Sequence, residues 1–456
     1  MNLSGKKTLV LGAGKSGITS AKFLAERGAV VALHDKREVE TWSVEARSLK
    51  ETHNVGLIGG DLPSWLLDQI DLVVISPGVP TNTIPAKYVD RKDGEVIGEV
   101  ELAFRFMKGK IIGITGSNGK TTTTTLIGEI LKDAGIETQV GGNIGTPLVT
   151  LAESSTENSI TVCELSSFQL ETIKDFRPNI AMCLNVTPNH MDRYELFSDY
   201  AAAKHRIFMN QTANDVAILN ADDEITASWK VGKRAKVVMF STSKELDEGL
   251  FLRGENLISR TNGEEKILIS RNILPIKGIH NVQNILAALA TGIACGVSLD
   301  SMRETIKKFK AVEHRLEFVK EIGGVKFYND SKATSVDATL KALEALSEER
   351  GKVNLILGGK GKNAPYQPLA ELIKSNVRKL VLIGEDADNI ESQLKDYAEI
   401  IRADSMNDAV VKAFENAENG DFVLLAPACA SFDMFSSYER RGTEFKSQVE
   451  GLRTKD

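Results

Sequence analysis

GITGSNGKTTTTT, residues 113–125, is the stretch of this sequence that says most about its fold. The apolar residues 111–115 predict a buried strand, and residues 122–134 predict the helix that follows. A glycine-rich turn between a strand and a helix presents backbone N–H groups and a partly positive helix end to an anion. Lys120 adds a full charge for the terminal phosphates, and the Thr121 hydroxyl is placed to hold Mg²⁺. The stretch therefore predicts a nucleotide triphosphate site.

One position departs from the strict phosphate-loop pattern, because Ile114 stands where that pattern has a glycine. The alternative is a glycine turn that serves only to begin a helix. The Gly-Lys-Thr sequence between a strand and a helix favours the phosphate site, and we expect ATP to bind over residues 116–122.

Outside this loop, short apolar stretches alternate with helical stretches along the chain. They form three series of predicted strands, at residues 7–11, 30–35 and 72–76; at 111–115, 160–165, 180–185 and 216–220; and at 325–328, 353–357, 379–383 and 422–425. The alternation predicts parallel sheets covered by helices, which is an α/β fold. We expect three domains, at residues 1–97, 98–311 and 312–456. Residues 250–270 predict a small hairpin with its turn at Asn262-Gly263.

The composition is that of a globular protein with more than one domain. The chain has 456 residues and a net charge of −6, with no basic block, which argues against nucleic acid as the main partner. Cys163, Cys183, Cys295 and Cys429 lie far apart in the sequence, so a zinc site or a disulfide framework is poorly supported. No apolar run approaches the roughly 20 residues that span a bilayer, and residues 1–14 lack an apolar signal core. We therefore expect a cytoplasmic protein without a membrane span.

The sequence GAGKSG, residues 12–17, follows the first predicted strand and has the GxGxxG spacing of a diphosphate-binding turn. Asp35 ends the next predicted strand, near the position at which an acidic side chain meets a ribose. Taken alone, this pattern predicts NAD. The same geometry receives any nucleotide diphosphate at a helix amino end, and a turn that needs glycine only for packing is a further alternative. The residues alone leave the base of the nucleotide open.

Polar side chains follow several predicted strands of the second series. Asn143 lies on a glycine-flanked turn, and Glu164 ends a buried strand, where a carboxylate is a suitable magnesium ligand. His190, Asp192 and Arg193, in NHMDRY, fit metal ligation or phosphate contact, with a loop histidine satisfied by its neighbours as the alternative. Lys204 lies on a predicted helix among alanines, which leave room for a group added to its amine. The alternative for Lys204 is a solvated helix face.

The third series carries four more polar clusters: HRLE (314–317), NDSKAT (329–334), GGKGK (358–362) and APACASFD (426–433). Asp330 and Lys332 directly follow a predicted strand, which is a common position for binding and catalytic groups in doubly wound sheets. Gly358 and Gly359 follow another predicted strand and allow a ligand to approach the backbone. These clusters predict ligand contacts from the third domain.

In content and in order, the motifs resemble those of the Mur ligases: GITGSNGKTT, GGNIG, ELSSFQLE, NHMDRY, AAAKHRI, HNVQN, HRLE, NDSKAT, GGKGK and PACASFDMF. The resemblance covers essentially the whole chain, and ELSSFQLE, NDSKAT and PACAS are similar to the family members that add D-glutamate. It implies a Rossmann-like UDP-substrate domain, a central P-loop ATPase-type domain and a C-terminal Rossmann-like domain. The implied activity is ATP- and Mg²⁺-dependent joining of D-glutamate to UDP-N-acetylmuramoyl-L-alanine, by a monomer, in cytoplasmic peptidoglycan precursor synthesis.

The resemblance also implies a role for each matching residue. The UDP-substrate site would comprise Lys15, Ser16, Asp35, Lys36, Arg37 and Asn143. The ATP site would comprise Gly116, Ser117, Asn118, Gly119, Lys120, Thr121, Thr122, Asn281, Asn284, Arg315 and Asp330. The D-glutamate site would comprise Lys332, Thr334, Lys362, Ser431 and Tyr438. One magnesium would bind near Thr121 and Glu164 and a second near His190 and a carbamylated Lys204, and the catalytic groups would be Lys120, His190, as the general base, and Lys204.

The chain departs from the family pattern at Lys360, where other members have an acid, and at Tyr438, where they have phenylalanine. Both changes concern the D-glutamate contacts. The alternatives within the superfamily are members that add L-alanine or a diamino acid, or a folylpolyglutamate synthase. An NAD-dependent dehydrogenase leaves residues 116–122 without a role, and a nucleotide-driven switch or motor leaves Lys204 and the third domain without one.

Overall fold

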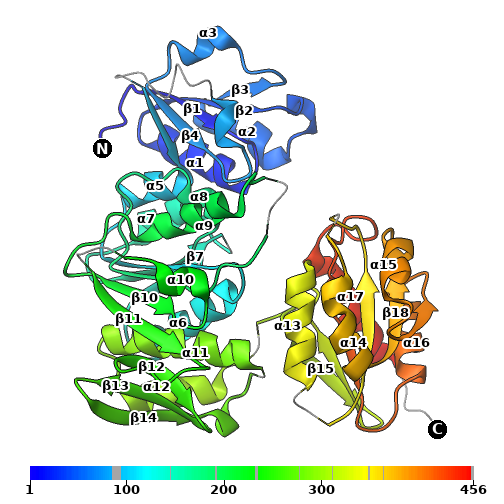
Figure 1. Cartoon of the computed structure of the whole chain (residues 1–456). Coiled ribbons are helices and arrows are strands. Elements are labelled where there is room, and N and C mark those ends of the chain that lie inside the picture. Colours follow the sequence, from blue (N-terminus) through cyan, green and yellow to red (C-terminus); the bar gives the residue numbers. More distant parts are fainter. Residues whose placement is uncertain are drawn as a thin grey trace. The chain divides into compact units, whose positions relative to one another are not determined.

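In the computed structural model, the described residues are 1–84, 94–143, 145–189, 193–231, 235–276, 278–310, 312–347, 350–362 and 364–452. They form three sheets, of five, nine and six strands (Figure 1). The chain divides into two compact units, Met1–Arg271 with Gln283–Ile306, and Asn272–Val282 with Lys307–Asp456. Among the described residues, no helix is both long enough and apolar enough to cross a membrane.

The N-terminal sheet is parallel throughout, with the strand order β3-β2-β1-β4-β5. Its strands are β1 (Lys7–Leu11), β2 (Val30–Asp35), β3 (Gly56–Gly59), β4 (Leu72–Ile75) and β5 (Glu95–Gly98), and its helices are α1 (Lys15–Glu26), α2 (Val44–His53) and α3 (Ser64–Leu67). The order reverses between β1 and β4, so a crevice opens between the loops that follow these two strands. β1 and β4 are buried apart from Lys7 because the sheet is covered on both faces.

The central sheet has the order β14-β13-β12-β11-β10-β9-β6-β8-β7. Its strands are β6 (Lys110–Thr115), β7 (Thr138–Gly142), β8 (Ile160–Glu164), β9 (Ile180–Cys183), β10 (Val216–Asn220), β11 (Lys236–Ser241), β12 (Gly249–Arg253), β13 (Asn256–Thr261) and β14 (Glu264–Ser270). Its helices are α5 (Glu99–Phe104), α6 (Lys120–Asp133), α7 (Leu148–Ser154), α8 (Ser167–Leu170), α9 (Phe197–His205), α10 (Glu224–Ser228), α11 (Ile279–Ala294) and α12 (Leu299–Lys308). β13 and β14 form the predicted hairpin, with positive φ at Asn262 and Gly263. β12 extends this hairpin to three strands, which the sequence analysis did not predict.

The C-terminal sheet has the order β15-β16-β20-β17-β18-β19, and only β15 runs antiparallel to its neighbour. Its strands are β15 (Glu317–Ile322), β16 (Val325–Asn329), β17 (Val353–Gly358), β18 (Val377–Ile383), β19 (Glu399–Arg402) and β20 (Phe422–Leu425). Its helices are α13 (Val336–Ser347), α14 (Ala370–Asn376), α15 (Ala387–Leu394), α16 (Met406–Glu415) and α17 (Tyr438–Gly451). The central strands β17 and β20 are buried along their whole length, and the helices cover both faces in two separate cores.

These sheets confirm the predicted α/β fold with three parallel-sheet domains. The domain limits at residues 97 and 311 stay predictions, and residue 311 itself lies outside the described residues. Residues 272–282 group with the C-terminal unit, although the predicted central domain includes them.

Candidate active site

The loop after β6 has the backbone that a phosphate site requires. Gly116 and Gly119 have φ of 149° and 82°, values that favour glycine. A Cβ at Gly119 would lie 2.3 Å from Asn284 Oδ1, so this glycine also makes room for α11. α6 begins at Lys120, directly after Gly119, and its amino end therefore points at the loop.

Side chains hold this loop in shape from several sides. Lys120 folds back over it, and Nζ donates to Gly116 O at 2.9 Å and Ser117 O at 3.0 Å. Ser117 Oγ donates to Thr187 O at 2.9 Å. The Asn118 backbone N–H donates to Asn185 Oδ1 at 2.8 Å. Because β9 leads into residues 184–187, the loop is braced by the strand beside β6.

Thr121, Glu164 and Asn143 form a hydrogen-bonded group beside the loop. Thr121 Oγ1 donates to Glu164 Oε2 at 2.8 Å, and Asn143 Nδ2 donates to Glu164 Oε1 at 2.9 Å. Glu164 is only 2 % exposed, and both of these donors are neutral groups. The charge of Lys204 acts on this buried carboxylate from nearby, and hydroxyl and carboxylate oxygens are the ligands that Mg²⁺ prefers. Thr121 and Glu164 therefore fit a magnesium ion at the phosphate loop.

Lys204 lies inside the protein and not on a solvated helix face. Its side chain is 1 % exposed, and Nζ donates to Gly116 O at 2.9 Å and lies 4.5 Å from the centre of the Tyr200 ring. Burial, and secondarily the charge of Lys120, lower the pKa of Lys204 to about 7. The Tyr200 hydroxyl is 3.0 Å from Ser117 Oγ, so α9 is attached to the phosphate loop by two residues. The alternative of a solvated lysine is wrong.

The motif NHMDRY, residues 189–194, lies only partly within the described residues. His190 and Asp192 lie outside the described residues, so the second predicted metal site stays a prediction. Arg193 is described, and its guanidinium contacts the N-terminal domain instead of the phosphate loop. Asn284 is 4 % exposed and lies against Gly119, and its contact with ATP stays a prediction. Asn281, Arg315 and Asp330 belong to the other compact unit, and their predicted contacts with ATP stay predictions.

In the N-terminal domain, Asp35 is bound to the glycine loop that follows β1. Its Oδ2 accepts from Ala13 N at 2.8 Å, and its two oxygens accept from Arg37 Nε and Nη2 at 2.9 and 3.0 Å. These bonds to Arg37, the largest effect, and to Ala13 hold the pKa of Asp35 well below its usual range. Gly17 permits the tight turn, because a Cβ there would lie 1.8 Å from Gly12 O.

The remaining predicted UDP-substrate residues lie around this loop. Lys15 Nζ donates to Gly145 O at 2.6 Å, so the first glycine loop is next to the turn that carries Asn143. Ser16 is half-buried at the start of α1, and Lys36 is exposed after β2. The structure brings Lys15 and Asn143 to the same region of the first compact unit, which supports a shared substrate site.

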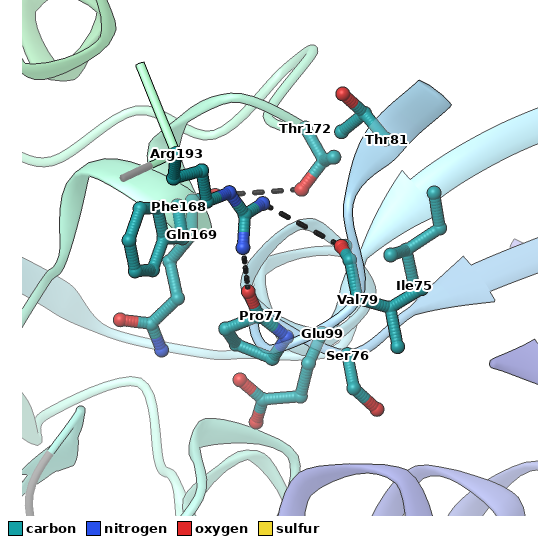
Figure 2. Close-up of a pocket in the computed structure, with 11 residues that line it drawn as sticks. Ile75, Ser76, Pro77, Val79, Thr81, Glu99, Phe168, Gln169, Thr172 and Arg193 are labelled. Carbon is teal, nitrogen blue, oxygen red and sulfur yellow. Dashed lines mark hydrogen bonds between the residues drawn. The ribbon is translucent and has the colours of Figure 1, made fainter. Parts of the chain in front are cut away.

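A small pocket lies where the N-terminal sheet meets the central domain (Figure 2). It is lined by Ile75, Ser76, Pro77, Val79, Thr81, Gly98, Glu99, Phe168, Gln169, Thr172 and Arg193. Ser76 Oγ donates to Gly12 O at 3.3 Å, so the loops after β1 and β4 face each other at the point where the strand order reverses. Ligands of open α/β sheets bind at this point.

Glu99 carries a buried carboxyl at this pocket. It is 2 % exposed, and its Oε1 accepts from the Val149 backbone N–H at 2.9 Å at the start of α7. Burial raises the pKa of Glu99 to about 7, and the backbone donors of Val149 and Leu148 oppose the rise only in part.

Glu99→Gln is expected to remove a loss of stability that the wild type shows as pH rises from 4.5 to 7. Because the folded pKa exceeds the unfolded value, the folded state binds more protons between pH 4.5 and 7, and the free energy of unfolding falls as pH rises through that window. The shift corresponds to about 3 kcal/mol. Urea unfolding at pH 5 and pH 8 should show the variant gaining on the wild type at pH 8. An equal difference at both pH values would contradict an ionising Glu99.

In the C-terminal unit, three predicted clusters meet because they follow three adjacent parallel strands. NDSKAT follows β16, PACAS follows β20 and GGKGK includes the end of β17. Lys360 and Ala430 exchange backbone hydrogen bonds of 2.9 and 3.0 Å, which join the last two clusters. Burial raises the pKa of Asp330 to about 7, against the opposing charge of Arg315.

The predicted D-glutamate residues lie on or beside these loops. Lys332 Nζ is 3.7 Å from the centre of the Tyr438 ring, so the tyrosine that departs from the family pattern still offers an aromatic face to a cation. Ser431 is buried, and its carbonyl accepts from the backbone of Met434 and Phe435. Thr334 is half-buried and Lys362 is exposed.

Three family models match this chain, and together they cover most of it. The Mur ligase MurD-like N-terminal domain matches residues 6–98, the Mur ligase middle domain 114–292, and the Mur ligase glutamate ligase domain 314–429. This chain belongs to the Mur ligase family.

The Mur ligase is also similar to curated proteins over its full length. A protein of Solibacter usitatus named UDP-N-acetylmuramoylalanine--D-glutamate ligase is 47 % identical over 456 residues, with 100 % of each chain covered. A protein of the same name from Acidobacterium capsulatum is 46 % identical, with 98 % of this chain and 97 % of that protein covered.

Solved structures share the fold of this Mur ligase at lower identity. The MurF ligase of Thermotoga maritima in complex with ADP has a TM-score of 0.64 and 18 % identity, over 98 % of this chain and 96 % of that chain. The UDP-N-acetylmuramate-alanine ligase MurC of Thermotoga maritima has a TM-score of 0.59 and 19 % identity, over 98 % and 100 %. The likeness extends across all three domains.

Ser76 and Arg441 of this Mur ligase were not among the predicted site residues. Ser76 ends a predicted strand, and this position was a usable signal. Arg441 is 2 % exposed and donates to Ser331 Oγ and O and to the carbonyls of Cys429 and Ala430, so it ties NDSKAT to PACAS. Nothing local distinguishes Arg441 from a surface arginine, because its burial depends on the packing of α17 against the sheet.

Proposed function

We propose that this Mur ligase uses ATP to join D-glutamate to UDP-N-acetylmuramoyl-L-alanine, in peptidoglycan precursor synthesis in the cytoplasm. The observation that carries the proposal is the full-length similarity, at 47 % identity, to a UDP-N-acetylmuramoylalanine--D-glutamate ligase. The phosphate loop, with its glycine backbone and the group of Thr121, Glu164 and Asn143, supports the ATP-dependent half of the reaction. The monomeric state stays a prediction.

The chemistry requires activation of a carboxylate, which is a poor electrophile at neutral pH. Transfer of the γ-phosphoryl group of ATP to the carboxylate of the alanyl residue gives an acyl phosphate and ADP. The amine of D-glutamate then attacks the acyl carbon, a tetrahedral intermediate forms, and phosphate leaves. Lys120 would stabilise the negative charge that develops on the transferred phosphoryl group, by position and charge. His190 is the proposed base that takes a proton from the ammonium group of D-glutamate, so that the free amine can attack.

Magnesium, when bound, would neutralise phosphate charge, and Thr121 and Glu164 would hold one ion. We propose a second ion near His190 and a carbamate on Lys204. The lowered pKa of Lys204 supports the carbamate, because only the neutral amine adds CO₂, and the product releases a proton and carries a carboxylate-like group. Such a group would compensate a metal charge where an ammonium would repel it.

We propose that the first domain supplies most of the contacts to the UDP-linked substrate and the third domain the contacts to D-glutamate. Lys15, Ser16, Asp35, Lys36, Arg37 and Asn143 would bind the UDP-linked substrate, and the proximity of Lys15 to Gly145 supports this grouping. Lys332, Thr334, Lys362, Ser431 and Tyr438 would bind D-glutamate. Two lysines suit a dicarboxylic acceptor, and the backbone joining GGKGK to PACAS supports a common acceptor pocket.

The test is phosphate release from ATP, Mg²⁺ and UDP-N-acetylmuramoyl-L-alanine across a panel of amino acids. We expect release that requires D-glutamate, with a new product whose mass equals the two substrates joined with loss of water. Release with a different amino acid would keep the ligase and overturn the acceptor. Release without any amino acid would indicate an ATPase, and no release with any acceptor would overturn the proposed reaction.

A further inference from the structure

Arg193 joins the central domain to the turn that follows β4 in the N-terminal domain (Figure 2). Nη1 donates to Pro77 O at 2.9 Å, and Nη2 lies 3.5 Å from Val79 O and donates to Glu171 Oε2 at 3.2 Å. The guanidinium carbon is 4.0 Å from the centre of the Phe168 ring. The side chain is 18 % exposed, so these bonds are largely shielded from water.

On the N-terminal side, the turn held by Arg193 touches the glycine loop after β1. A Cβ at Gly12 would lie 2.9 Å from Val79 Cγ2, and a Cβ at Gly17 would lie 2.9 Å from Ser76 Oγ. Both glycines therefore exist in close contact with the turn. A displacement of Val79 would remove the side chain that packs against Gly12 and would let the glycine loop move.

On the central side, the partners of Arg193 lead to the phosphate loop. Glu171 also accepts a short hydrogen bond from the Tyr194 hydroxyl. The Tyr194 ring packs edge-on against Tyr200, with ring centres 5.3 Å apart, and the Tyr200 hydroxyl is 3.0 Å from Ser117 Oγ. A continuous set of contacts thus runs from the turn after β4 to the ATP loop.

We propose that Arg193 is a positioning residue that holds the turn after β4, and with it the first glycine loop, in register with the ATP loop. The proposal rests on the proposed function for its substrates. Arginine suits this role because its planar fork can serve two carbonyls and a carboxylate at once, which a lysine ammonium cannot do in the same geometry. The proposed UDP-substrate site takes Lys15 from the N-terminal domain and Asn143 from the central domain, so it depends on how these two domains are aligned. The ATP loop is held separately, by residues 185–187.

The experiment compares Arg193→Lys with Arg27→Lys. Arg27 also joins the N-terminal domain to the central domain, because its Nη1 donates to Glu153 Oε1 at 3.2 Å. It lies at the carboxyl end of α1, whereas the glycine loop lies at the amino end. We expect Arg193→Lys to raise the KM for UDP-N-acetylmuramoyl-L-alanine about tenfold and to leave the KM for ATP within about twofold. Arg27→Lys should change neither. Glu171→Gln, which keeps an acceptor for Tyr194, should raise the same KM by a smaller factor.

A second measurement does not depend on catalysis. Amide hydrogen exchange at residues 12–17 and 76–84 should be faster in Arg193→Lys than in wild type, with residues 116–122 unchanged. Equal rises in both KM values, or unchanged exchange at residues 76–84, would overturn the positioning role. If exchange at residues 12–17 and 76–84 is faster in Arg193→Lys but the wild type joins no D-glutamate, the proposed function is overturned and the role of Arg193 stands.

Discussion

Lys120→Ala is expected to lower kcat by about 10³-fold, the cost of losing one preorganised charge at a transferring phosphoryl group. In the structure its Nζ donates hydrogen bonds to the carbonyls of Gly116 and Ser117, which hold it at the loop. The measurement is steady-state phosphate release with saturating UDP-substrate and D-glutamate. The thermal unfolding temperature should change little, because the Lys120 side chain that donates these bonds is partly exposed.

Lys132→Ala is the matched control, since Lys132 lies on the same helix, α6, and is exposed in its last turn. It should leave kcat within about twofold, as surface substitutions usually do. A kcat for Lys120→Ala within about tenfold of the wild type would contradict the assignment of Lys120 to the phosphoryl group.

Lys204→Met is expected to lower kcat by a comparable factor, about 10³-fold, because no carbamate can form and one ligand of the second metal is lost. Methionine fills a similar volume among the buried neighbours, so the fold should survive the change. Lys204→Arg keeps a positive charge but cannot carry a carbamate, and it should be equally inactive. Lys204→Ala leaves a cavity at the same position, and recovery of its activity by added acetate or formate would identify the missing group as a carboxylate.

The same hypothesis predicts a dependence on pH and on CO₂. With a pKa of about 7, Lys204 is mainly an ammonium at pH 6 and mainly a neutral amine at pH 8. Carbamate formation needs the neutral amine, so occupancy should rise with pH, and added bicarbonate should raise activity most at low pH. With ¹³C-bicarbonate, NMR should detect a carbamate carbon in the wild type and none in Lys204→Met. A full-activity wild type without that signal would overturn the carbamate.

Local patterns were sufficient to predict the phosphate loop, the parallel sheets and the strand-end position of the polar clusters. The reason is physical: Gly116 and Gly119 adopt backbone angles that favour glycine, and buried parallel strands such as β4 are apolar along their whole length. Spacing could not choose between UDP and NAD at the first glycine loop, because any diphosphate is bound there by the same backbone groups. The family resemblance made that choice.

Tertiary packing decided what no local pattern contains. Lys204 among alanines has the sequence of a solvated helix face, and only the packing of α9 against the phosphate loop buries its amine and lowers its pKa. Arg193 could equally have contacted a phosphate, and the approach of the turn after β4 directs it to Pro77 and Val79 instead. Burial and partners of a charged side chain depend on segments far apart in the chain, so they are properties of the folded protein and not of the neighbouring residues.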